Sequence, residues 1–179
     1  MAKLKILTYP DPRLRKKATP VESFGDETAQ IVDDLLETMY EAKGIGLAAT
    51  QADIQKAILV VDISSDRDRP QCLINPQIIE SHGVEEMEEG CLSVPGIHAK
   101  VKRAERIRVR AQDRDGAAHE FTADGLLAVC IQHEMDHLRG KLFVDYLSAE
   151  NRRRVLEEVK RIKRTGKVPV REEVPYELV

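Results

Sequence analysis

Hydrophobic and polar positions along this chain follow two different periods, one typical of helices and one typical of strands. Residues 26–43 place apolar side chains three and four positions apart, with acidic residues between them. This spacing predicts an amphipathic helix that Gly44 ends as a C-terminal cap. A similar spacing predicts a helix at 124–138 and a last helix at 148–164, which begins at the N-cap residue Ser148.

Between the first two helices the pattern changes to short aliphatic runs. Residues 57–61 ("AILVV") predict one buried strand, and residues 71–79 predict a second that Asn75-Pro76 breaks. A third strand is expected around residues 84–89. These runs are too short for helices and suit the strands of a sheet.

Strict alternation marks residues 105–113, where apolar side chains alternate with arginines. The turn at 113–116 leads back into residues 117–121, which predicts an antiparallel hairpin. The first 25 residues are rich in proline and predict an extended arm with short turns. The order of helix, antiparallel strands, helix and helix favours an α+β fold, with the strands packed around a central helix.

Composition adds limits to this picture. The 179 residues are 42% hydrophobic and 33% charged, with a net charge of −3, which is typical of a soluble globular protein. We expect a single catalytic domain at residues 1–165 and a tail at 166–179. Three cysteines are a poor disulfide framework, and no secretory signal or membrane-spanning run is present, so a cytoplasmic location is expected. The charge predicts neither membrane binding nor specific nucleic-acid binding.

The strongest chemical signal is "HEMDH", residues 133–137. On a helix, residues four apart share a face, so His133 and His137 can hold one metal ion. Glu134 then lies beside the ion and can accept a proton from a water molecule. The helix at 124–138 is therefore predicted to bind a metal.

A catalytic metal normally takes three protein ligands, and the sequence offers several candidates for the third. In the extended zincin pattern it would be a histidine at the position of Phe143, so that pattern fails. Glu157 or Glu158 in the last helix could serve, as in some metallopeptidases. Cys91 is another candidate, and spacing alone does not decide among them.

Three segments together resemble the peptide deformylase family: "GIGLAATQ" at 44–51, "EGCLS" at 89–93 and "QHEMDH" at 132–137. They stand in the family's order, and the resemblance covers roughly residues 4–165. It implies that Cys91, His133 and His137 hold the metal, one Fe²⁺ per chain, for which Zn²⁺, Ni²⁺ or Co²⁺ can substitute.

The resemblance also implies a reaction, the removal of the formyl group from N-formylmethionyl nascent peptides, with release of formate. Glu134 would move the proton of the attacking water. The side-chain amide of Gln51 and the backbone N–H of Leu92 would stabilise the oxyanion.

Further residues follow from the same resemblance. The backbone of Ile45, Gly46 and Gly90 would pair with the substrate main chain. Glu89 and Arg103 would brace the site. His98 stands where many bacterial relatives carry arginine, which leaves substrate contacts there open.

Leu126, Val129 and Cys130 lie on the same helix stripe as the histidines. They could line a pocket for the methionine side chain, or they could be ordinary core residues. The basic last helix suggests a weak ribosome contact. Two rival functions remain, an endopeptidase that uses Glu157 or Glu158 as a ligand and a metal-bound module without catalytic activity.

Overall fold

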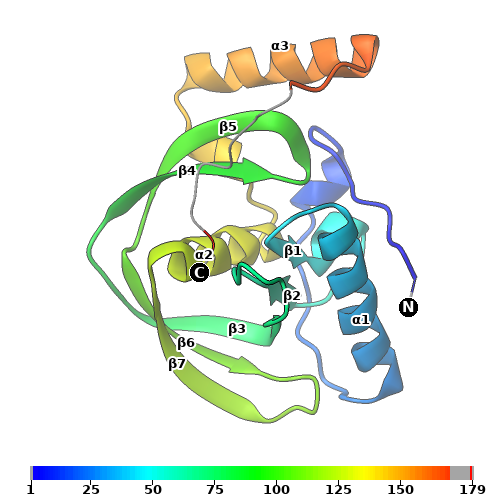
Figure 1. The fold of residues 1–179 in the computed structure, drawn as a ribbon, viewed down its shortest axis with the longest axis vertical. Coiled ribbons are helices and arrows are strands. Elements are labelled where there is room, and N and C mark those ends of the chain that lie inside the picture. Colours follow the sequence, from blue (N-terminus) through cyan, green and yellow to red (C-terminus); the bar gives the residue numbers. More distant parts are fainter. Residues whose placement is uncertain (1, 170–177, 179) are drawn as a thin grey trace.

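The structure is a computed structural model that describes residues 2–169 and residue 178 (Figure 1). In this part of the chain there are three α-helices: α1 (Asp26–Glu41), α2 (Gly125–Leu138) and α3 (Ala149–Thr165). The strands are β1 (Gly46–Ala48), β2 (Ile58–Val61), β3 (Gln71–His82), β4 (Glu85–Cys91), β5 (Val94–Arg103), β6 (Arg106–Gln112) and β7 (Ala118–Asp124). Short 3-10 helices lie at Pro12–Arg15, Ala49–Ala52 and Phe143–Tyr146.

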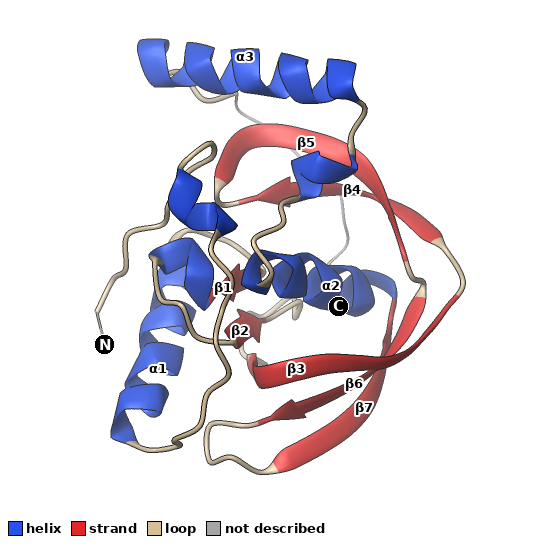
Figure 2. Cartoon of the chain, turned by 180° about the vertical axis from the view of Figure 1, so that it is seen from behind, coloured by secondary structure: helices blue, strands red, loops and turns tan. Residues whose placement is uncertain are grey.

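The strands form two antiparallel sheets. Five of them follow the order β1-β2-β3-β6-β7, and β4 and β5 form a separate hairpin. Figure 1 shows α2 in the middle of the molecule, with the β4–β5 hairpin on one side and β3, β6 and β7 on the other. From behind, Figure 2 shows α1 beside β1 and β2 and α3 outside β5. The predicted α+β class, with strands around a central helix, is confirmed.

The central position of α2 follows from its composition. Ala128 and Ile131 are fully buried and pack into a core with residues of β6 and β7, such as Val109 and Ala123. The opposite face of the helix carries the polar residues of "HEMDH", and it is buried as well. A helix covered on both sides gives a set of side chains a rigid platform.

The predicted cap at Gly44 is wrong in detail. Helix α1 ends at Glu41, and Lys43 takes the left-handed conformation at φ 58°. The N–H of Lys43 donates to Tyr40 O at 3.0 Å, and the N–H of Gly44 donates to Met39 O at 2.9 Å. This is a Schellman ending in which Gly44 follows the left-handed residue. A Cβ at Gly44 would lie 2.6 Å from Leu92 Cδ1, so a side chain at this position would displace Leu92.

The predicted break at Asn75-Pro76 is also wrong, because β3 runs through it. Asn75 adopts φ 51°, and the pairing with β6 shifts register between Ile74 and Gln77. The side chain of Asn75 accepts from Val21 N at 2.8 Å and donates to Gln112 Oε1 at 2.8 Å. A bulge therefore absorbs the proline, which has no N–H to give to the ladder.

The sequence patterns did not predict β1 or β5. Strand β5 shows no aliphatic run, but it pairs with β4 along its length and buries Val94, Ile97 and Val101. The predicted last helix is confirmed, since Ser148 caps α3 by accepting from Asn151 N at 3.2 Å and Gly166 ends it at φ 68°. Of the predicted tail, residues 170–177 and 179 lie outside the described residues. Among the helices that the structure describes, none is both long and apolar enough to cross a bilayer.

Candidate metal centre

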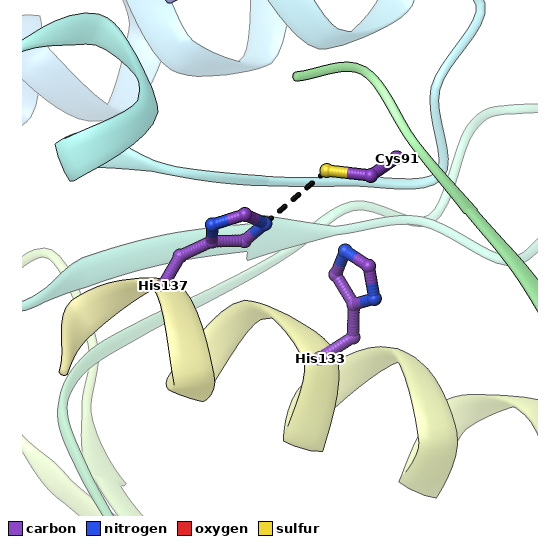
Figure 3. A group of neighbouring side chains, drawn as sticks. All are labelled: Cys91, His133 and His137. Carbon is purple, nitrogen blue, oxygen red and sulfur yellow. Dashed lines mark hydrogen bonds between the residues drawn. The ribbon is translucent and has the colours of Figure 1, made fainter. Parts of the chain in front are cut away.

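Helix α2 carries two histidines that face the end of strand β4. His133 and His137 are one helical turn apart, and Cys91 is the last residue of β4. Their potential ligand atoms all lie within 4.8 Å of one another. Figure 3 shows both imidazoles rising from the helix toward the Cys91 sulfur, which lies 3.3 Å from His137 Nε2. One ion could therefore contact a thiolate and two imidazoles at this point.

The turn between β4 and β5 brings Cys91 into place. The strand pairing shifts between Gly90 and Cys91, and Cys91 pairs directly with Val94 across a two-residue turn. The N–H of Ser93 lies 3.4 Å from Cys91 Sγ, which suits a thiolate acceptor. Val94 is fully buried and anchors the turn in the core.

The other candidates for a third ligand do not reach the histidines. Among the described residues, the group that can hold a metal consists of Cys91, His133 and His137. Glu157 is largely exposed, and Glu158 pairs with Arg161 on α3. Phe143 stacks on the His133 ring, with 6.0 Å between ring centroids. Phe143 thus stands at the position where the extended zincin pattern has a ligand, and its ring packs against His133 instead.

A buried chain of charged groups holds His133 in position. Glu89 Oε1 lies 2.8 Å from His133 Nδ1, and Arg103 donates to both Glu89 oxygens at 2.6 and 2.8 Å. Arg103 also donates to Asp136 Oδ2 at 2.9 Å. The Glu89 contact uses Nδ1, so Nε2 of His133 is directed toward Cys91 and is available to a metal. Burial raises the pKa of Glu89, but its bonds to His133 and Arg103 outweigh this and keep the pKa below its usual value.

Two members of this network, Asp136 and Tyr146, were not predicted from the sequence. The Tyr146 hydroxyl donates to Asp136 Oδ2 at 2.7 Å, and its ring lies 5.0 Å from the Arg103 guanidinium carbon. Asp136 stands inside "HEMDH", and an acidic residue directly before a candidate ligand was the available signal. Tyr146 gave none, because its part in the network depends on the loop after α2.

Glu134 points into the same space as the histidines. Its carboxylate is buried, with Oε1 3.9 Å from His133 Nε2 and no hydrogen-bond partner for Oε2 among the described residues. Burial raises the pKa of Glu134 to about 7. A carboxylate with a free oxygen and a raised pKa can accept a proton from water and release it again.

Gln51 faces Cys91 from the 3-10 helix after β1. Its Oε1 accepts from Ala48 N at 2.9 Å, so its Nε2 is the atom that points outward. That nitrogen lies 2.9 Å from Ser93 Oγ and 3.6 Å from Cys91 Sγ. The amide is thereby oriented with its donor toward the candidate metal centre, next to Leu92, which directly follows Cys91.

A pocket of about 370 Å³ opens beside this centre. Its walls include the segment 44–46, Gly90, Leu126, Val129, Cys130, His133 and Glu134. Val129 and Cys130 are almost fully buried, and Cys130 also belongs to the core around α2, so this stripe of α2 contributes to both the pocket wall and the core. His98 lies across the hairpin from Gly90 and lines the pocket too.

Comparison with known proteins identifies the family. The family model described as polypeptide deformylase matches residues 3–153. The chain belongs to the polypeptide deformylase family. This confirms the resemblance drawn from the three motifs, and a deformylase is a hydrolase.

Individual deformylases are similar over nearly the whole chain. The peptide deformylase of Chromohalobacter salexigens is 57% identical over 162 residues, which covers 90% of this chain and 95% of that protein. The crystal structure of a peptide deformylase from Legionella pneumophila has a TM-score of 0.89 and 47% identity, covering 92% of this chain and 98% of that one. The crystal structure of the Ehrlichia chaffeensis peptide deformylase in complex with actinonin has a TM-score of 0.88 and 40% identity. The match covers 92% of this chain and 100% of that one.

Proposed function

We propose that the chain is a metal-dependent peptide deformylase that removes the formyl group from N-formylmethionyl nascent peptides and releases formate. One observation carries the proposal. Cys91, His133 and His137 bring three ligand atoms together at a pocket whose wall includes the carboxylate of Glu134. In a member of the deformylase family, this combination supports amide hydrolysis rather than a purely structural metal site.

The donors fit a first-row divalent metal. A thiolate and two imidazoles suit Fe²⁺, Zn²⁺, Ni²⁺ or Co²⁺ better than Mg²⁺ or Ca²⁺, which take oxygen ligands. We propose Fe²⁺ as the resident ion, one per chain, with the other three as substitutes. A bound divalent metal would supply Lewis acidity, which makes hydroxide available near neutral pH.

The residues around the centre have distinct proposed roles. Glu134 takes the proton of the attacking water at its free oxygen and delivers it to the leaving nitrogen. The Gln51 amide and the Leu92 N–H donate to the formyl oxygen as charge develops on it. Glu89 and Arg103 keep His133 in one tautomer and one orientation.

The pocket would hold the first substrate residue. The apolar stripe of Leu126, Val129 and Cys130 suits an unbranched, flexible methionine side chain. The backbone of Ile45, Gly46 and Gly90 would pair with the peptide main chain in the manner of an added strand. Such pairing is independent of side chains, as an enzyme acting on many different nascent chains requires. Residues 1–165 as a single catalytic domain stay a prediction.

The direct test is formate release from a formyl-Met-Ala-Ser peptide by anaerobically purified protein, with metal analysis of the same sample. We expect one formate for each formyl peptide consumed. We also expect about one metal ion per chain, as one three-ligand centre implies. Absence of formate from a folded, metal-replete sample would refute the proposal.

Two variants separate this function from its rivals. Cys91→Ala should lose the metal, whereas an endopeptidase with Glu157 or Glu158 as a ligand would keep it. A Glu134→Ala variant with full function would favour a non-catalytic module.

A ribosome contact through α3 is the proposed means of meeting nascent chains. The exposed face of α3 carries the basic residues Arg152, Arg153, Arg154, Lys160, Lys163 and Arg164. Such a surface binds phosphate backbones weakly and in a salt-dependent way. Removal of residues 148–179 should abolish co-sedimentation with ribosomes at low salt, and unchanged co-sedimentation of the folded remainder would contradict it.

A further inference from the structure

The loop that follows β2, residues 62–69, contains Arg67. The side chain of Arg67 contacts the segment 44–46, which is part of the pocket wall. The Arg67 guanidinium donates to the carbonyl of Gly44 and, at 2.5 Å, to the carbonyl of Asp62. Its central carbon lies 5.2 Å from the centre of the Tyr40 ring. Arg67 therefore connects helix α1, the loop after β2 and the segment 44–46.

Hydrogen bonds to the side chain of Asp62 order the loop that carries Arg67. Asp62 is buried, and its carboxylate accepts from the Tyr40 hydroxyl at 2.6 Å and from Ser64 N and Oγ at 2.8 and 2.5 Å. Arg69 N approaches the same carboxylate at 3.2 Å. Arg67 itself has a left-handed backbone at φ 56°, a conformation that non-glycine residues avoid. Such a conformation persists where the surrounding contacts require it.

The contacts of Arg67 and Asp62 determine the orientation of two peptide groups. Arg67 binds Gly44 O, and the N–H of Asp62 donates to Ile45 O at 2.9 Å. A trans peptide is planar, so its N–H points away from its own C=O. Holding Gly44 O directs the N–H of Ile45, and holding Ile45 O directs the N–H of Gly46.

The partners of both bonds lie outside the pocket lining. Gly44, Ile45 and Gly46 line the pocket, whereas neither Arg67 nor Asp62 is among the described residues that do so. The N–H groups of Ile45 and Gly46, opposite the held carbonyls, are thereby kept in fixed orientations at the pocket wall. Gly46 also lies close to Glu134, because a Cβ at this position would be 2.8 Å from Glu134 Oε1.

We propose that Arg67 is a positioning residue for substrate main-chain recognition, acting through the Gly44–Ile45 peptide group. This inference rests on the proposed deformylase function. Arg67 does not touch the reacting atoms, so its loss affects binding in the ground state and the transition state alike. Uniform loss of binding raises KM and leaves kcat unchanged.

The test is steady-state kinetics of metal-loaded protein with formyl-Met-Ala-Ser. For Arg67→Met we expect KM to rise on the order of tenfold, the value of about one hydrogen bond, with kcat unchanged. Arg67→Lys keeps one donor and the charge near Tyr40, so its KM should fall between Arg67→Met and the wild type. Arg108→Met, which removes an exposed arginine of β6, is the matched control and should leave both constants unchanged.

Spectroscopy gives a second, activity-independent readout. In zinc-loaded, ¹⁵N-labelled protein, the product peptide Met-Ala-Ser should shift the Ile45 amide resonance in the wild type and shift it less in Arg67→Met. If Arg67→Met does not fold, Arg67→Lys carries both tests. Wild-type activity with an unchanged KM in the Arg67 variants overturns this inference alone, whereas an inactive, metal-replete wild type overturns the proposed function.

Discussion

Helices α2 and α3 have similar lengths, 14 and 17 residues, but they differ in the number and the exposure of their charged residues. Helix α3 carries many more charged residues, and almost all of them face solvent, since Val155 and Val159 are its buried residues. Helix α2 carries few, and it buries them: His133, Glu134 and Asp136 are each less than a tenth exposed. The surroundings of a charge, rather than the number of charges, therefore indicate where chemistry occurs, since an unpaired buried charge is costly.

The largest expected difference between the two helices concerns catalysis. Glu134→Gln on α2 removes the proposed proton carrier without changing shape, and should lower kcat/KM by about 10²–10⁴-fold. Glu157→Gln on α3 is the matched control and should have no effect. Formate release measures both, with metal content and melting temperature unchanged. A Glu134→Gln protein with wild-type turnover would remove the distinction between the helices.

The next difference concerns stability. Arg103→Met leaves the buried carboxylates of Glu89 and Asp136 without their shared cation, and should cost about 3–5 kcal/mol of unfolding free energy. Urea denaturation gives the value directly. A loss below about 1 kcal/mol would mean that the network is no stronger than a surface ion pair.

An ion pair of intermediate burial involves Asp145, which lies between α2 and α3 in the sequence. Arg15 donates to its two carboxylate oxygens at 2.7 and 3.0 Å. Burial raises the pKa of Asp145, but the Arg15 bonds outweigh it and hold the pKa below the usual 3.8. The ionised form thus stabilises the fold above about pH 5, and this contribution is lost as the pH falls through 3.8 and below.

Asp145→Asn should therefore cost about 1 kcal/mol near pH 7, since solvent partly screens the pair. The difference from wild type should shrink as the pH approaches 3. Thermal denaturation between pH 3 and pH 7 measures this, and a constant difference across that range would contradict it.

The smallest effect is expected on α3. Arg154 pairs with Glu150 one turn away, and both side chains are mostly exposed. Arg154→Ala should change the unfolding free energy by about 0.5 kcal/mol or less. A loss comparable to that of Arg103→Met would show that α3 packs more tightly than its exposure indicates.

Local patterns were sufficient for the helices and for the chemistry of "HEMDH". The period of apolar residues reflects which side of a helix is buried, so it predicted α2 and α3 closely, and capping chemistry located the N-cap Ser148. Spacing four on a helix also placed His133 and His137 on one face, because helix geometry is the same in every protein.

What the sequence alone left open was decided by contacts between distant segments. Cys91 approaches His137 because β4 and β5 form a hairpin over α2, and no local rule relates positions 46 residues apart. Strand β5 and the bulge at Asn75 likewise depend on their partner strands. The parts played by Asp136, Tyr146 and Arg67 belong to the tertiary structure for the same reason. Local chain geometry determines a helix face, whereas a buried charge acquires its role only when other segments supply its partners.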